Sequence, residues 1–338
     1  MIKKIFNILE RKHKFQLALL IFLYFPLNII ETLSFSSIPA FIIFIDNPEV
    51  LNNYINLQSL IDVISVLSFR ERVYYGSLLL IIVFIIRGLS IFLINSFGYY
   101  LRYKITMSNS RRLYLSYLNK PYKFHINNNP ANLAQNTTDT IKSTAVVLAY
   151  ANIVKDTILL IFIFTAIYLA TPSEFLQLIL ITMLPAIFLF IFVKNKLKKF
   201  GKIGRNFRLA ASKSLIEGFS SIKYILISNS KKIFLKDYYK KQKISSKQDT
   251  ILAILNISPR IIIELICLIF IFVFIIINVK QADSINSFIP TLTLIVVAVV
   301  RIIPALGQIS VNFNSVKFHS YTVDNINSEI LELEKNKE

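Results

Sequence analysis

Three arginines of this sequence stand inside or beside long apolar stretches. Arg87 follows the apolar run 78–86, Arg301 follows 296–300, and Arg260 begins an apolar run of its own. A guanidinium group is costly in hydrocarbon, and its planar set of donors matches the oxygens of a phosphate group. These residue types at these places indicate a binding site for an anionic group, and a pyrophosphate suits three arginines well.

Two acidic residues accompany the arginines. Glu264 follows Arg260 by four residues, a spacing at which opposite charges pair on a helix. Glu31 lies in the first apolar stretch, either in a water-lined cavity or in a hydrogen bond between packed helices. In the competing interpretation Glu264 satisfies Arg260, while Arg87 and Arg301 extend their charged ends to the cytoplasmic interface. A further charged pair, Lys155 and Asp156, is expected to be structural.

Residues for metal or nucleotide chemistry are scarce. The one cysteine, Cys267, excludes an internal disulfide, and three scattered histidines predict no metal site. No G-x-x-x-x-G-K-[ST] phosphate-binding motif occurs, and the seven glycines form no glycine-rich loop. We therefore expect no catalytic residue and no cofactor in this chain itself.

The composition is that of an integral membrane protein. Of the 338 residues, 54% are hydrophobic and 17% are charged, against roughly 45–50% and 25% in soluble domains. The mean hydropathy is +0.58. The formal net charge of +19 comes from base-rich segments that alternate with base-poor ones between apolar blocks. That alternation is typical of membrane loops and argues against a nucleic-acid-binding surface.

A helix needs roughly 20 apolar residues to cross the hydrocarbon core of a membrane. The stretches long enough to do so are 15–45, 73–101, 144–170, 175–193, 251–279 and 285–313. At about 1.5 Å per residue, Arg87, Arg260 and Arg301 lie roughly 20, 28 and 24 Å from the outer ends of their helices. We therefore expect them to share one layer in the cytoplasmic half of the membrane.

The charges of the connections predict the orientation. The connection 194–249 carries 16 basic and three acidic residues, and the connection after 101 holds six basic residues before its first acid. The positive-inside rule places both connections and both termini on the cytoplasmic side of the membrane. Apolar residues recur there at helical spacing, which favours helical hairpins over solvated basic loops beside anionic lipid. The expected fold is all-α, with six transmembrane helices and two long cytoplasmic helical hairpins.

Two short segments in these connections resemble a known family. Pro121 begins the segment PYKFHINN, and Leu215 begins LIEGFSSIK. Together with the expected topology, they resemble the transmembrane domain of a type-1 ABC exporter. The resemblance implies that the hairpin tips dock on ATPase domains and transmit the ATP-driven motion. The residues expected to couple in this way are Tyr122, Lys123, Phe124, His125, Glu217, Gly218, Ile222 and Lys223.

Three further stretches resemble the PglK family of bacterial flippases for lipid-linked oligosaccharides. They are IIET at 29–32, PRIIIE at 259–264 and RIIPA at 301–305. The resemblance implies a homodimer that moves a glycan on a polyprenyl pyrophosphate, and a short external helix in 47–55 that contacts the lipid tail. The residues expected to bind this substrate are Arg87, Arg260, Arg301, Glu31 and Glu264.

The sequence departs from that family in one large respect. The family continues into an ATPase domain, whereas here we expect the transmembrane domain over 1–330 and a tail over 331–338. A partner ATPase would then hydrolyse the ATP, unless the chain is truncated or is a remnant without its ATPase. The alternative functions are a generic exporter of lipid, drug or peptide and a non-catalytic scaffold. A membrane-embedded glycosyltransferase is disfavoured because the charged residues of the internal loops are almost all basic, lysine above all.

Overall fold

The computed structural model describes residues 2–46, 68–170, 172–279 and 285–335, and within these ranges it contains helices and no strand. The helices are α1 (Ile2–Ile8), α2 (Arg11–Asp46), α4 (Phe69–Leu118), α5 (Tyr122–Asn127), α6 (Pro130–Ala170), α7 (Pro172–Ser220), α8 (Ile222–Ile227), α9 (Lys231–Val279), α10 (Ile285–Phe318) and α11 (Ser320–Lys335). The predicted all-α class is confirmed for the described residues.

Five of these helices, α2, α4, α6, α9 and α10, are long and apolar enough to cross a membrane. The chain is therefore an all-α protein of the multi-pass membrane class, as its composition predicts. Another predicted crossing, 175–193, falls within α7, where most side chains lie outside the described part of the chain. The expected external helix in 47–55 also lies outside the described residues.

The longest helices greatly exceed the thickness of a bilayer. α4 has 50 residues and α9 has 49, so each extends about 75 Å, against about 30 Å of hydrocarbon. In α4 the apolar part comes first and a part rich in arginine, lysine and tyrosine follows, whereas α9 has the reverse order. The hydrocarbon core is therefore too thin to cover either helix over its whole length.

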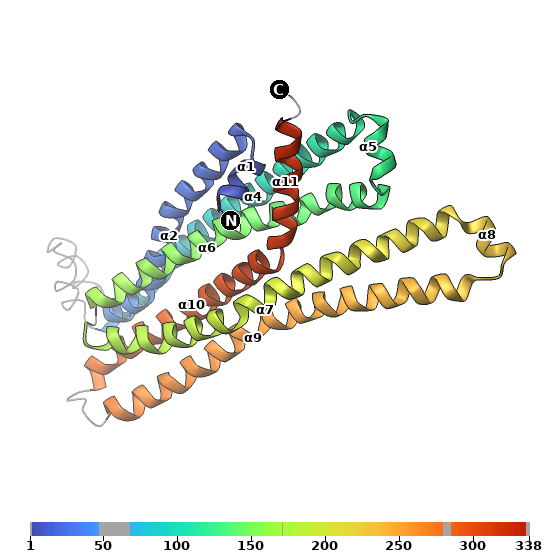
Figure 1. Ribbon diagram of the computed structural model, residues 1–338. Helices are drawn as coiled ribbons and strands as arrows, with labels where there is room; N and C mark the ends of the chain where they lie inside the picture. The colour runs from blue at the N-terminus through green and yellow to red at the C-terminus, as the bar shows by residue number, and fades with distance from the viewer. Residues whose placement is uncertain (1, 47–67, 171, 280–284, 336–338) are drawn as a thin grey trace.

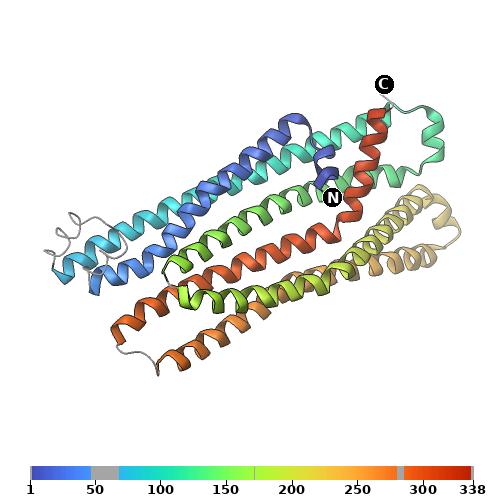
Figure 2. The ribbon, with the colours of Figure 1, turned by 60° about the vertical axis from the view of Figure 1, so that its left-hand side comes forward.

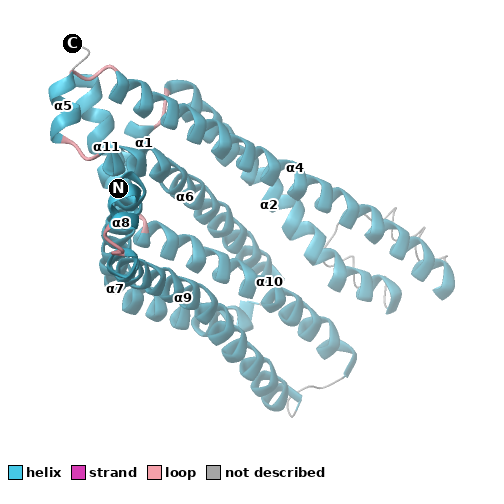
Figure 3. Ribbon diagram, turned by 90° about the vertical axis from the view of Figure 1, so that its right-hand side faces the viewer, coloured by secondary structure: helices cyan, strands magenta, loops and turns pink. Residues whose placement is uncertain are grey.

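Short helices turn the chain at the tips of two hairpins (Figure 1). α5 connects α4 with α6, and α8 connects α7 with α9. Both tips lie at the same end of the molecule in Figures 1 and 3, with α11 and α1 near that end. At the opposite end a capping box begins α4, in which Ser68 and Glu71 satisfy each other's backbone N–H groups.

α6 and α10 form the centre of the bundle. α2 and α4 pack on one side of this centre, and α7 and α9 pack together on the other (Figure 2). One hydrophobic core joins α1, α2, α4, α6 and α11, and a second joins α6, α9 and α10. α6 contributes to both cores, for example through Val146 and Ile163. Polar residues that face the space between α2, α4, α6 and α10 are consequently brought together.

Candidate functional site

Two of the three predicted arginines converge in the apolar part of the bundle. The guanidinium carbon of Arg87, on α4, lies 4.3 Å from the ring centroid of Phe35 on α2, and that of Arg301, on α10, lies 4.9 Å from the same centroid. Phe84 presents a second ring to Arg87 at 5.6 Å. Arg301 also forms an ion pair with Glu31, which lies one turn before Phe35 on α2. Since an aromatic face attracts a cation, Phe35 holds two cations close together.

This group, the Arg87–Arg301 site, carries more positive than negative charge. The carboxylate that it contains among the described residues is Glu31, which is 4% exposed and paired with Arg301. Arg87 forms no ion pair with any residue in the described ranges. The Nε atoms of both arginines are buried and lack a hydrogen-bond partner in the same part of the chain. A desolvated cation without a counter-charge is costly, so an anion beside Arg87 would stabilise the site.

The third predicted arginine lies apart from this site. Arg260 and Glu264 are both exposed on α9, and no ion pair joins them in the structure as described. Arg260 packs instead near Gly307 of α10, where a Cβ atom built on the glycine would lie 3.4 Å from the Cβ of Arg260. Gly307 is six residues, about 9 Å, beyond Arg301. Arg260 forms no hydrogen bond, ion pair or ring contact with Arg87, Arg301 or Phe35 in the described part of the chain, so two of the three predicted arginines are brought together.

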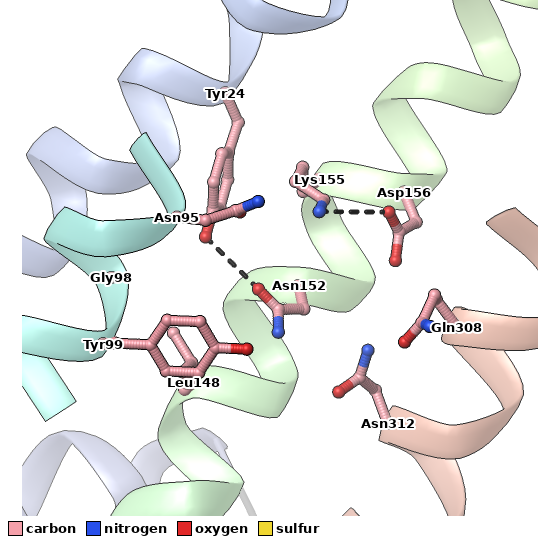
Figure 4. Close-up of a pocket in the computed structure, with 10 residues that line it drawn as sticks. All are labelled: Tyr24, Asn95, Gly98, Tyr99, Leu148, Asn152, Lys155, Asp156, Gln308 and Asn312. Carbon is pink, nitrogen blue, oxygen red and sulfur yellow. Dashed lines mark hydrogen bonds and ion pairs between the residues drawn. The ribbon is translucent and has the colours of Figure 1, made fainter. Parts of the chain in front are cut away.

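A polar cavity lies along the same helices as the Arg87–Arg301 site (Figure 4). Its volume is about 270 Å³, and α2, α4, α6 and α10 all contribute to its wall. The polar residues that line it are Tyr24, Asn95, Tyr99, Asn152, Lys155, Asp156, Gln308 and Asn312. Four of these side chains are amides, which both donate and accept hydrogen bonds. We call this space the amide cavity.

Few groups of the amide cavity are paired with one another. The hydroxyl of Tyr24 donates to Oδ1 of Asn152 at 3.3 Å, and Nζ of Lys155 lies 3.6 Å from Oδ1 of Asp156 (Figure 4). Oδ2 of Asp156 is buried and has no hydrogen-bond partner among the described residues. Asn28 of α2 fixes this part of α6 by donating to the backbone oxygen of Lys155 at 2.9 Å. The cavity therefore has unused hydrogen-bonding capacity.

The first group of expected coupling residues lies on α5. Tyr122, at the beginning of the helix, is 79% exposed, and Lys123 is also exposed. Phe124 faces inward and stacks on Tyr117 of α4, with ring centroids 6.2 Å apart. His125 meets the edge of Phe124 at 5.4 Å. Phe124 thus anchors the tip helix, while Tyr122 and Lys123 are available to a partner.

The second group lies where α7 meets α8. Glu217 and Gly218 end α7, and Ile222 and Lys223 begin α8. Glu217 is exposed, and its carboxylate lies 3.7 Å from Nζ of Lys213. Large exposed apolar side chains surround this turn, namely those of Phe219, Ile222, Tyr224, Leu226, Ile227, Ile233 and Leu235. Exposed apolar side chains concentrated at one turn are typical of a protein contact surface.

A buried polar network joins the two hairpins to α11. Arg205 of α7 donates to Oδ2 of Asp139 at 2.8 Å and to Oδ1 of Asn136 at 2.9 Å, and both acceptors lie on α6. Asn136 and Tyr117 each donate to the carboxylate of Glu329 on α11, at 3.0 Å in both cases. Burial raises the pKa of Glu329 above its usual value. The network ties together elements that lead to both tips.

Several of these residues could not be identified as site residues from the sequence. Phe35, Arg205 and the amides of the cavity are of common types at unremarkable spacings, and only their packing sets them apart. No protein-family model matches the chain, and no curated protein matches it.

Proposed function

We propose that this chain is the membrane-spanning half of an ATP-driven ABC transporter that moves a polyprenyl-pyrophosphate-linked oligosaccharide, or a similar anionic glycolipid, across a bacterial inner membrane. In this proposal the chain crosses the membrane six times and has both termini in the cytoplasm. A separate ABC ATPase binds the tips at α5 and α8, and two copies of the chain form a homodimer. The observation that carries the proposal is the convergence of Arg87 and Arg301 on Phe35.

The charge balance of the Arg87–Arg301 site supports an anionic substrate. Two guanidinium groups meet one carboxylate, Glu31, so one positive charge lacks a counter-charge among the described residues. Charges at membrane depth are expensive and mark substrate pathways in transporters. A pyrophosphate supplies both negative charge and oxygens that accept from a planar guanidinium group.

The two tips support a cytoplasmic protein partner. α5 exposes Tyr122 and Ile126, and the turn around α8 exposes a larger apolar patch. The helices that lead to these tips are too long for the membrane to cover their ends. Because the tips lie at one end of the molecule (Figure 1), two ATPase domains of a dimeric transporter could contact them from the same side of the membrane.

The exposed apolar surface of α4 supports both lipid contact and pairing of two copies. None of the most apolar window of α4 is buried inside the chain. The exposed side chains there include Leu79, Ile82, Ile86 and Leu93. An apolar surface of this kind is stable when it packs on lipid tails or on the same surface of a second copy of the chain.

Reconstitution tests the proposal through the two arginines. The chain would be placed in vesicles with the ABC ATPase that co-purifies with it, and flipping of a fluorescent polyprenyl-pyrophosphate disaccharide would be followed. Arg87→Gln and Arg301→Gln should each slow flipping at least tenfold, because each removes a charge-assisted interaction worth about 1.5–3 kcal/mol. The lysine variants should retain part of the rate, since they keep the charge but lose the planar donors.

Arg70→Gln is the matched control, because Arg70 is exposed at the beginning of α4, far from the site. It should flip the lipid at the wild-type rate. Flipping at that rate by the Arg87→Gln, Arg301→Gln double variant would contradict a phosphate site. Absence of any co-purifying ATPase would contradict the transporter itself and favour a remnant.

A further inference from the structure

The amide cavity and the Arg87–Arg301 site are stacked along the same three helices. Tyr24 precedes Glu31 by seven residues on α2, and Asn95 follows Arg87 by eight on α4. Gln308 follows Arg301 by seven residues on α10. Each separation corresponds to about 10–12 Å. Since α2 runs opposite to α4 and α10, all three steps lead in the same direction, toward the end of the bundle that carries α5 and α8.

The chemistry changes between the two sites. The Arg87–Arg301 site has an excess of positive charge, whereas the charges of Lys155 and Asp156 balance in the amide cavity. The side chains of Asn95, Gln308 and Asn312 make no hydrogen bond to any described residue, and Oδ2 of Asp156, which is 5% exposed, also lacks a partner. Amides donate and accept at once, and a carboxylate accepts, which is the pattern that hydroxyl groups satisfy.

We propose that the amide cavity binds the sugar units next to the pyrophosphate of the transported lipid, a role that rests on the function proposed above. A lipid in the cytoplasmic leaflet presents its tail to the membrane core, then its pyrophosphate, and then its glycan toward the cytoplasm. The bundle presents apolar side chains, then two arginines, and then the amide cavity in the same order. The sites of the bundle therefore match the lipid both in the order of its parts and in the chemistry of each part.

The size and lining of the cavity suit a neutral polar ligand group. At about 270 Å³ it is close to the smallest small-molecule sites, of roughly 300 Å³, so it holds one or two sugar units and not a whole oligosaccharide. Tyr99, which is 63% exposed, offers an amphipathic ring with an apolar face and a hydroxyl group. A second phosphate is disfavoured because Asp156 would face it.

Binding measurements on the full chain in nanodiscs test this assignment. The probes are a short-chain polyprenyl pyrophosphate carrying a disaccharide and the same lipid without sugar. The variant Asn152→Leu, Asn312→Leu keeps similar side-chain volumes but removes two amides from the wall. It should bind the glycosylated lipid about tenfold more weakly, the effect expected for one or two neutral hydrogen bonds, and should bind the bare lipid as the wild type does.

Asn256→Leu, on α9 and outside the cavity, is the matched control and should leave both affinities unchanged. The Arg87→Gln, Arg301→Gln double variant should weaken binding of both lipids by the same factor. Equal affinity of the wild type for the two lipids, or an unchanged preference in the Asn152→Leu, Asn312→Leu variant, overturns the sugar site but leaves the phosphate site standing. Failure of the wild type to bind either lipid overturns the sugar site and the proposed function together.

Discussion

Asp139 and Asp249 each form an ion pair with an arginine of α7, but only one pair is buried. Asp139 meets Arg205 at 2.8 Å with both side chains almost fully buried, whereas Asp249 meets Arg208 at 2.7 Å near the surface. Asp139→Asn should lower the free energy of unfolding by about 3–5 kcal/mol, because it leaves a buried guanidinium without its carboxylate. Asp249→Asn should cost about 0–1 kcal/mol. Thermal or denaturant unfolding in detergent compares the two; equal losses would contradict the burial argument.

His319, between α10 and α11, predicts a pH dependence of stability. Burial lowers the pKa of His319 to about 4, and Lys142 and Arg208 shift it in the same direction, while Asp249 and Asp139 oppose them. The unfolded chain, with a pKa near 6.5, binds the proton first as the pH falls. The stability that neutral His319 contributes is thus complete above about pH 6.5 and is lost as the pH falls toward 4. As the pH falls from about 6.5 to about 4, the melting temperature of the His319→Gln variant should fall less than that of the wild type. An equal fall in both proteins would contradict the prediction.

Among the helices, the crossing of α7 with the end of α10 depends on a glycine. A Cβ atom built on Gly201 would lie 1.8 Å from the backbone oxygen of Phe318, whereas one built on Gly88 of α4 would meet nothing within 4 Å. Gly201→Ala must therefore displace α7 from the junction of α10 and α11, and should lower the melting temperature by several degrees. Gly88→Ala should be neutral or stabilising by up to about 1 kcal/mol, because alanine favours the helix. Equal melting temperatures for the two variants would show that α7 does not pack tightly on the backbone at Phe318.

For the whole molecule, the membrane orientation is testable by labelling from outside the cell. Cys267→Ala removes the buried native thiol. In that background Arg70→Cys, at the end of the bundle opposite the tips, should react with a membrane-impermeant maleimide, and Lys232→Cys, beside α8, should react only after lysis. The physical reason is the concentration of basic residues around α8, which the positive-inside rule keeps in the cytoplasm. External labelling of Lys232→Cys would contradict the orientation and, with it, a cytoplasmic ATPase partner.

Much of the fold follows from local properties of the sequence. Hydropathy and length alone predict long apolar helices, and the alternation of basic connections predicts their orientation. Hydropathy also identifies Arg87, Arg301 and Glu31 as charged residues in apolar stretches, where they need partners. The helical class and the membrane character are confirmed, while six crossings and the ABC family stay predictions.

The tertiary structure decided which of these residues meet. Glu31 and Arg301 are far apart in the sequence and form an ion pair because α2 and α10 pack together, while Arg260 lies apart despite its similar estimated depth. The amide cavity exists because four helices each turn one polar strip toward a common space. The rotation and lateral position of a helix come from side-chain packing between distant segments, which no local pattern of hydropathy or charge records.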